Sequence, residues 1–188
     1  MRIVGGRLRG RPLAVPSDEA TRPTSDRVRE AAFNILAHGI DAAVIEGARV
    51  LDLFAGTGAL GIEALSRGAA FCLFVDEHAE ARGVIRENVE ALGLTGVTKI
   101  FRRDATDLGP SGKYANFTLA FLDPPYAKGL GEKALVSAAD NGWLADGAIV
   151  VLEERKDAEI RLPTRFVELD RRTWGDTQMV FAAYKPNG

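Results

Sequence analysis

Short apolar runs, separated by segments with helical spacing, dominate the chain from residue 49 onward. The runs that predict buried strands cover residues 50–54, 71–75, 98–102, 117–122 and 148–153, with a closing pair at 165–172 and 178–184. Apolar residues at three- and four-residue spacing predict helices that end near residue 68 and that cover 79–92 and 133–141. This alternation predicts an α/β fold: a Rossmann-like, doubly wound and mainly parallel sheet with an antiparallel C-terminal strand pair.

The N-terminal part of the chain follows a different pattern. Apolar residues between positions 3 and 15 alternate with glycines, which predicts a short, irregular β-hairpin standing outside the main domain, although a flexible basic tail also fits. A helix is expected to begin after Thr24 or Ser25, either of which can cap it, and to end at Gly39. We therefore expect a hairpin extension at residues 1–19 and a main domain at residues 20–188.

The composition is that of an ordinary globular domain, with 188 residues, of which 46% are hydrophobic and 27% charged. No apolar run approaches the roughly 20 residues needed to cross a bilayer, and no signal peptide is visible, so we expect a cytoplasmic protein. Cys72 is the only cysteine, and His38 and His78 are the only histidines, so we expect neither a disulfide nor a metal site. Cys72 lies in a predicted strand, which favours a core position.

Basic residues are concentrated near the N-terminus, although the net charge is −2. Residues 1–17 contain arginines at positions 2, 7, 9 and 11 and no acid. Arg7, Arg9 and Arg11 are therefore predicted to contact nucleic-acid phosphates, and Arg22 and Arg29 to extend this basic surface. For the arginines at the start of the predicted helix, a surface ion pair is the alternative.

A glycine-rich loop between a predicted strand and a predicted helix indicates a site for a nucleotide-type cofactor. Gly56, Gly58 and Gly61 follow the strand at residues 50–54 with the spacing of a dinucleotide-binding fingerprint. Asp76 lies 20 residues after Gly56, at the end of the next strand, where a carboxylate can accept hydrogen bonds from two ribose hydroxyls.

Two further acids bear on the choice of cofactor. Asp52, just before the loop, would repel a pyrophosphate but would stabilise a cation, such as the sulfonium and ammonium groups of S-adenosylmethionine. Alternatively, Asp52 caps backbone amides of the loop. Asp104, at the end of the third strand, can accept a hydrogen bond from an adenine amino group or can lie in a surface turn.

The segment Asp-Pro-Pro-Tyr at residues 123–126 ends the apolar strand at 117–122 abruptly. Two prolines cannot donate to a sheet and fix a stiff turn. A carboxylate, a fixed carbonyl group and an aromatic ring at the carboxyl end of a strand suit a flat substrate with an amino group, such as a nucleobase. A tight turn with an incidental Asp and Tyr is the alternative.

These motifs resemble those of a known family. Residues 51–58, which include Phe54, are similar to motif I of class I S-adenosylmethionine-dependent methyltransferases, and residues 123–126 are similar to their amino-methylating motif IV. Together with residues 2–6, 21–30, 141–144 and 174–177, they resemble the bacterial 16S ribosomal RNA guanine-N2 methyltransferases of the RsmD type over essentially the whole chain. Trp174 departs from the tyrosine that this family usually has there.

The resemblance implies a class I methyltransferase fold and transfer of a methyl group from S-adenosylmethionine to the N2 amine of a guanine in small-subunit ribosomal RNA, either naked or in an assembling subunit. It also implies that residues 24–29 close over the cofactor and substrate, and that the basic hairpin binds RNA. The cofactor contacts are then expected from Thr24, Arg27, Asp52, Phe54, Gly56, Gly58, Asp76 and Asp104.

In the chemistry that this implies, an ionised Asp123 and the carbonyl group of Pro124 would each accept one N–H of the target amine, while Tyr126 would stack on the base. Adenine-N6 methylation of DNA or RNA is the alternative activity. Protein glutamine methylation fits less well, because such enzymes have Asn at the position of Asp123. An NAD-dependent oxidoreductase or a non-enzymatic RNA-binding factor would leave the Asp-Pro-Pro-Tyr segment unexplained.

Overall fold

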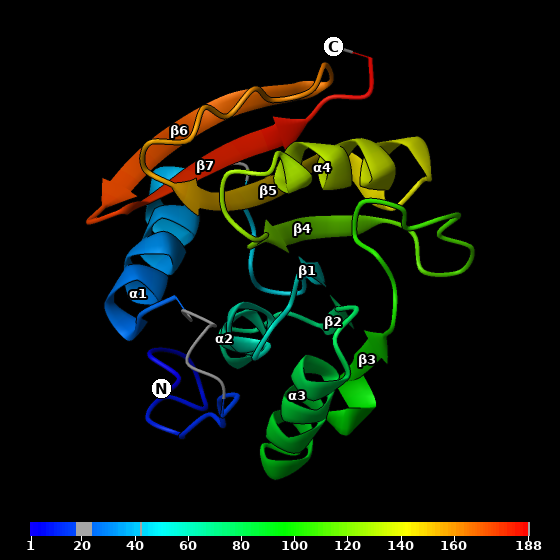
Figure 1. Cartoon of the computed structure of the whole chain (residues 1–188). Helices are drawn as coiled ribbons and strands as arrows, with labels where there is room; N and C mark the ends of the chain where they lie inside the picture. Colours follow the sequence, from blue (N-terminus) through cyan, green and yellow to red (C-terminus); the bar gives the residue numbers. More distant parts are fainter. Residues whose placement is uncertain (18–23, 42, 188) are drawn as a thin grey trace.

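A central β-sheet organises the protein (Figure 1). The computed structural model describes residues 1–17, 24–41 and 43–187. The strands in these residues are β1 (Arg49–Leu53), β2 (Phe71–Val75), β3 (Thr98–Phe101), β4 (Phe117–Leu122), β5 (Leu144–Arg155), β6 (Phe166–Trp174) and β7 (Thr177–Tyr184). Together the described strands form a seven-stranded sheet with the order β3-β2-β1-β4-β5-β7-β6.

The helices of the described residues lie on the two faces of this sheet. They are α1 (Asp26–Asn34), which continues as a π-helix (Ile35–Gly39), α2 (Ala59–Ser66), α3 (Ala79–Ala91), a short 3-10 helix (Thr95–Val97) and α4 (Leu130–Asp140). Ser25 caps α1, because its side chain accepts a hydrogen bond from the Val28 amide.

Strands β1 to β5 run parallel, and β7 pairs antiparallel with both β5 and β6. The predicted fold is therefore confirmed. The strands at 71–75 and 117–122 agree with their predicted bounds, whereas β5 begins at Leu144 and ends at Arg155, beyond the predicted 148–153. The chain passes from β1 outward to β3 and then returns to β4 beside β1, so the strand order reverses between β1 and β4. Ligands bind at such a reversal, at the carboxyl ends of the strands.

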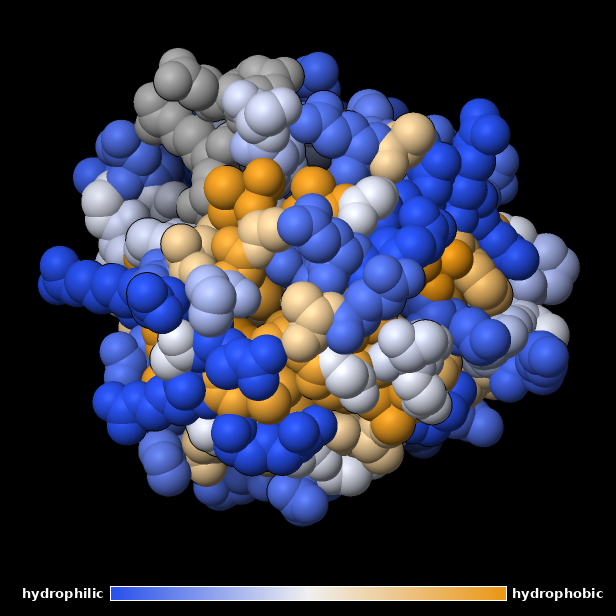
Figure 2. All heavy atoms as spheres, turned by 90° about the horizontal axis from the view of Figure 1, so that it is seen from below, coloured by the Kyte–Doolittle hydropathy of each residue, from blue (hydrophilic) through white to orange (hydrophobic). Residues whose placement is uncertain are grey.

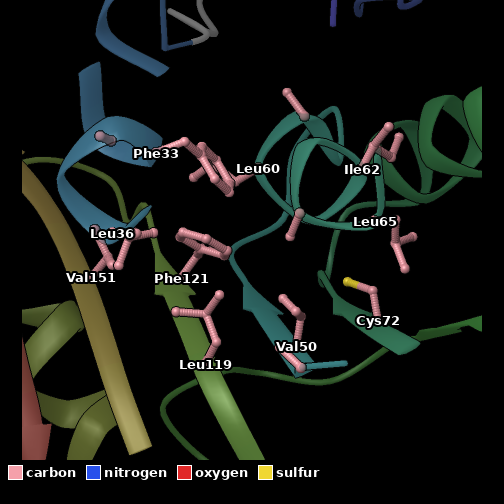
Figure 3. Packing of buried hydrophobic residues seen from close by; sticks show 14 of the residues in the cluster. Phe33, Leu36, Val50, Leu60, Ile62, Leu65, Cys72, Leu119, Phe121 and Val151 are labelled. Carbon is pink, nitrogen blue, oxygen red and sulfur yellow. The ribbon is translucent and has the colours of Figure 1, made fainter. Parts of the chain in front are cut away.

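The core has two halves, one on each face of the sheet. In the first half, α1, α2 and α3 cover alternate residues of the strands. Figure 3 shows Phe33 of α1 and Leu36 of the π-helix directed toward Phe121 of β4 and Val151 of β5, and the rings of Phe33 and Phe121 lie 5.5 Å apart. In the second half, α4 packs on the opposite face, where Trp143 is fully buried. Burial on both faces explains why these strands are continuous apolar runs.

The N-terminal loop belongs to the first half of the core. Ile3, Leu8 and Leu13 are buried there, and one isolated β-bridge, between Arg2 and Pro12, closes the loop. The expectation that this segment stands outside the main domain is therefore wrong. The predicted domain boundary between residues 19 and 20 lies outside the described residues.

A close approach to α2 explains the glycines of this loop. A Cβ atom on Gly6, which has a φ of +78°, would lie 2.0 Å from the Ser66 carbonyl oxygen, so no larger residue fits without a shift of the backbone. Ser66 also accepts a hydrogen bond from the Arg7 amide at 2.9 Å. The apolar residues turn inward because the glycines let the loop lie flat on α2.

A buried ionic cluster joins this loop to α1 and α2. The Glu63 side chain, which is fully buried in α2, accepts hydrogen bonds from the amides of Val4 and Gly5 at 3.0 and 2.9 Å. The same carboxylate pairs with Arg29 at 3.2 Å and with Arg67 at 2.9 Å. One carboxylate therefore holds three separate segments together, and we call these five residues the Glu63 cluster.

The face seen in Figure 2 carries hydrophilic side chains around its rim, with hydrophobic side chains visible between them in the middle. Among the described helices, none is long and apolar enough to cross a membrane.

Candidate active site

A cavity of about 1040 Å³ lies at the carboxyl ends of the parallel strands. The loops that follow β1, β2, β3 and β4 border it, as expected for a site at the reversal of strand order. The cavity brings together most of the candidate catalytic and cofactor-binding residues that the sequence singled out. Those that line it are Phe54, Gly56, Asp76, Asp104, Asp123, Pro124 and Tyr126.

Asp76 orders the loops on both sides of it. One carboxylate oxygen accepts a hydrogen bond from the Gly56 amide at 2.9 Å, and the other accepts one from the His78 amide at 2.9 Å. Each carboxylate oxygen has two lone pairs, so both retain capacity to accept a hydroxyl from a ligand in the cavity. Asp104 folds onto its own turn, because its Oδ1 accepts hydrogen bonds from the amide and hydroxyl of Thr106 at 2.8 and 2.7 Å.

The glycine loop passes tightly over β2 before α2 begins. Phe54 borders the cavity with a φ of +54°, a conformation that is uncommon outside glycine and is often found at functional sites. A Cβ atom on Gly61 would lie 2.6 Å from both the Cys72 sulfur and the Phe74 ring, so only glycine allows α2 to pack this closely. Gly58 also faces the core rather than the cavity, against Phe74 and Ile85.

Asp52 lies behind the loop and does not line the cavity. Its side chain is 1% exposed and accepts a hydrogen bond from the Gly61 amide at 3.1 Å. Burial is the main cause that raises the pKa of Asp52 well above its ordinary value, and the nearby Asp76 adds to the effect. The structure thus shows the alternative role, in which Asp52 holds the loop through a backbone amide.

Asp123 stands at the C-terminal end of β4, next to an acid of β5. Leu122 pairs with Leu152 in the parallel register, so the residues that follow, Asp123 and Glu153, are neighbours. Their two carboxyl groups are close enough to form a hydrogen bond when one of them carries a proton. Glu153 is 4% exposed and also accepts a hydrogen bond from the Thr24 hydroxyl at 2.6 Å.

This environment favours a protonated Asp123. Burial raises the pKa of Asp123 well above its ordinary value, and the nearby charges of Glu153 and Asp52 raise it further. A protonated carboxyl group can donate to Glu153 and still accept at its other oxygen. Both effects favour a proton on this carboxyl pair, whereas the sequence suggested an ionised Asp123.

The remaining residues of the Asp-Pro-Pro-Tyr segment are fixed from both sides. Pro124 is buried and borders the cavity. Tyr126 also borders it, and its hydroxyl forms a hydrogen bond with the Thr177 side chain of β7. Burial raises the pKa of Tyr126, so its phenol stays neutral. The segment therefore presents a carboxyl group, a backbone carbonyl group and a ring on one side of the cavity.

Comparison with known proteins agrees with this arrangement. A family model described as "Conserved hypothetical protein 95" matches residues 1–183. The chain belongs to this family. Within it, the chain is 38% identical over 194 residues to the "Putative rRNA methyltransferase YlbH" of Bacillus subtilis, covering 100% of both proteins.

Two Escherichia coli matches, one from the curated proteins and one from the solved structures, extend the comparison of this Conserved hypothetical protein 95 member. It is 40% identical over 164 residues to the "Ribosomal RNA small subunit methyltransferase D", which covers 87% of this chain and 78% of that protein. A solved structure named "Putative methyltransferase yhhF" superimposes with a TM-score of 0.82 and 34% identity, covering 98% of each chain. The resemblance to the RsmD type is confirmed.

The N-terminal predictions for this family member have different outcomes. Thr24 is buried against Glu153 and Arg27 is exposed, and neither residue borders the cavity. Arg22 lies outside the described residues. The prediction that Arg29 contacts RNA is wrong. Its side chain is 0% exposed and pairs with Glu63 inside the protein, so in this fold it cannot reach RNA.

The three arginines of the N-terminal loop remain candidates for phosphate contacts. Arg7, Arg9 and Arg11 are all exposed. The Arg11 guanidinium donates a hydrogen bond to the Ala91 carbonyl at the end of α3, at 3.1 Å, which orients it along that helix. The loop thus presents its charges outward while its apolar residues pack inward.

Two buried acids that lie next to the site, outside the cavity lining, were missed in the sequence. Glu153 and Glu154 are 4% and 3% exposed, and both end the apolar run of β5. Glu154 accepts hydrogen bonds from the Ala127 and Arg155 amides at 2.9 and 2.8 Å and so fixes the turn after Tyr126. The signal was present, because acids that end a buried strand beside β4 must lie near Asp123.

Proposed function

We propose that the protein transfers a methyl group from S-adenosylmethionine to the exocyclic N2 amine of a guanine in 16S ribosomal RNA, in the cytoplasm. The observation that carries this proposal is that Asp123, Pro124 and Tyr126 border the same cavity as Gly56 and Asp76. An amine-binding corner and a nucleotide-type site therefore open into one space. The names of the Bacillus subtilis and Escherichia coli relatives support ribosomal RNA as the substrate class.

The residues of the cavity fit S-adenosylmethionine better than a dinucleotide. Arg103 is the only Lys or Arg among the described lining residues, and it already donates to the Leu108 carbonyl at 2.9 Å. Carboxylates outnumber it, and anionic walls favour a sulfonium and an ammonium group over a pyrophosphate. These lining carboxylates are Asp76, Glu77, Glu80 and Asp104.

Gly56, Asp76 and Asp104 would hold the cofactor, through the loop backbone and the two carboxylates at the ends of β2 and β3. When bound, the cofactor supplies an electrophilic methyl group. Asp52 contributes to this site indirectly, by holding the loop at Gly61.

The chain's own contribution is to orient the amine. A guanine amino group is a weak nucleophile, because its lone pair is delocalised into the ring. The free carboxyl oxygen of Asp123 and the carbonyl group of Pro124 can each accept one N–H, which turns the lone pair out of the ring plane. Tyr126 can stack on the base, a contact worth roughly 1–3 kcal/mol. Holding the amine and the methyl group in a reactive geometry can lower the barrier by several kcal/mol, and by about 7–11 kcal/mol in the best cases.

The target guanine must be unpaired or displaced from its stack to enter the cavity, since a paired amino group is out of reach. Exposed Arg7 and Arg9 can then contact the flanking phosphates.

The test is transfer of a radiolabelled methyl group to 16S ribosomal RNA, supplied both as naked RNA and as small subunits from cells that lack this protein. Mass mapping of the product should locate one N2-methylguanine, and Asp123→Ala should remove the signal. Label on an adenine N6, or on no nucleotide of either substrate, would refute the proposal. Titration with S-adenosylhomocysteine and with NAD tests the cofactor, and only the first should bind.

A further inference from the structure

Glu153 is buried behind the catalytic corner and does not border the cavity. Its carboxyl group nevertheless contacts two segments of the site, through its hydrogen bonds with Asp123 and with the Thr24 hydroxyl. A substrate in the cavity can reach Asp123 but not Glu153. The direct route from Glu153 to the amine therefore runs through Asp123, whereas Thr24 and Tyr126 are the other groups it affects.

We infer that Glu153 is a positioning residue that accepts, by way of Asp123, the proton which the target amine loses on methylation. The hydrogen bond to Glu153 aims the free oxygen of Asp123 at the cavity. The Thr24 hydroxyl donates a hydrogen bond to Glu153 at 2.6 Å and so restrains it. This inference rests on the proposed function, because it assigns a residue to that reaction.

The proton balance of the step is complete without an outside base. The amine nitrogen forms a bond to the methyl carbon as the bond from that carbon to sulfur breaks, and the sulfur keeps the electron pair. The nitrogen then gives one proton to the free oxygen of Asp123, while Asp123 passes its own hydroxyl proton to Glu153. The pair goes from one shared proton to two, and later releases the second to water.

The surrounding groups set the pH at which the pair can act. Burial, Asp52, Glu154 and Glu153 itself all raise the pKa of Asp123. Burial and Glu154 raise the pKa of Glu153, whereas the hydrogen bonds from Thr24 and Asp123 lower it. Tyr126, also close to these carboxyl groups, has a raised pKa and stays neutral. A pair that already holds two protons cannot accept another, so transfer should rise with pH as the pair loses its first proton, to a plateau.

The main experiment is Glu153→Gln in the full chain, with methyl transfer to 16S ribosomal RNA measured across pH at saturating substrate. Gln can still accept the Thr24 hydrogen bond but cannot take up a proton. Asp123 must then take the amine proton alone, as a less basic carboxylate, so the plateau rate should fall by up to about 10²-fold, the smaller end of the usual contribution of a proton acceptor. Affinity for S-adenosylhomocysteine should stay within about twofold, because Glu153 does not border the cavity.

Glu154→Gln is the matched control. Glu154 is equally buried on the same strand, but its carboxylate is used by the amides of Ala127 and Arg155, which Gln can also satisfy. This variant should keep the plateau rate. Its rising limb should move to lower pH, since the loss of a like charge lowers the pKa values of Asp123 and Glu153.

Thr24 provides a second variant that leaves both carboxyl groups in place. Thr24→Val removes the hydrogen bond that lowers the pKa of Glu153, so the rising limb should move to higher pH. Thr24→Ser keeps the hydroxyl and should restore the limb. A merely structural role of Thr24 predicts no movement of the limb.

A measurement on the cofactor-free protein separates this inference from the proposed function. Carboxyl-carbon NMR should show Asp123 titrating at a lower pH in Glu153→Gln than in the unaltered chain, because the like charge and the hydrogen bond are lost. An unmoved Asp123 titration, or a Glu153→Gln plateau within about twofold of the unaltered rate, overturns the inference. Absence of transfer by the unaltered chain overturns the proposed function instead, and the NMR titration still decides whether Asp123 and Glu153 share a proton.

Discussion

The Glu63 cluster makes a sharp prediction about stability. Glu63→Ala removes the fully buried carboxylate that pairs with Arg29 and leaves Asp26, which is 45% exposed and 2.9 Å away, as the remaining carboxylate partner of the guanidinium. Breaking a buried pair by removing one partner costs about 3–5 kcal/mol. The amides of Val4 and Gly5 also lose their acceptor, which adds to this loss, whereas the Asp26 pair reduces it.

Urea unfolding, followed by circular dichroism, measures this loss directly. For a domain of this size, about 3–5 kcal/mol corresponds to a fall in Tm of about 6–20 °C. The control is Glu159→Ala, because Glu159 pairs with Arg161 at 2.9 Å with both side chains more than 70% exposed. That variant should change the free energy of unfolding by less than about 0.5 kcal/mol. A loss below about 1 kcal/mol for Glu63→Ala would show that Glu63 does not stabilise the buried Arg29 side chain.

Three other variants test the site and the N-terminal loop. Replacing both Arg7 and Arg9 with Ser should weaken RNA binding while the Tm stays the same. The slope of log binding constant against log salt concentration should become shallower by about 1.4, the value for two phosphates on a single strand. An unchanged slope would exclude these contacts. Asp76→Ala should raise the Kd for S-adenosylhomocysteine about 10- to 100-fold by calorimetry, because a charge-assisted hydrogen bond is lost, and an unaltered Kd would place the cofactor elsewhere. Asn88→Ala should cost about 1–3 kcal/mol in urea unfolding, because its 2%-exposed side chain makes hydrogen bonds to both the amide and the carbonyl of Ala14; equal stability would count against that link.

The sheet was predictable because its strands are buried on both faces. Strands β2 and β4 are uninterrupted apolar runs that end at Asp76 and Asp123, so the sequence marks both of their ends. Strand β5 was predicted too short, since its register with β7 extends to Arg155 through residues that carry no strand signal. Pairing with a distant strand, rather than local preference, sets those ends.

The candidate site was predictable where a motif is continuous in sequence. The glycine loop and the Asp-Pro-Pro-Tyr segment can each be recognised from consecutive residues, and in the structure both border one cavity. Arg29 and Glu63 are 34 positions apart, and nothing near Arg29 in the sequence reveals a buried partner. Glu153 was missed for a similar reason, because its importance comes from its register with β4. The inward packing of residues 1–17 likewise depends on the shape of α2, which no local pattern contains.

The attachment of the N-terminal loop to α2 has a geometric consequence. Arg7 and Arg9 sit on a segment fastened to the same helix that begins at the glycine loop, so their separation from Asp123 is fixed by the fold. This fixed distance selects the RNA that can bind. If these arginines bind phosphates, only an RNA in which those phosphates and the displaced guanine lie the same distance apart can contact the arginines and Asp123 at once. The architecture of the substrate, more than its local base sequence, then decides which nucleotide is modified.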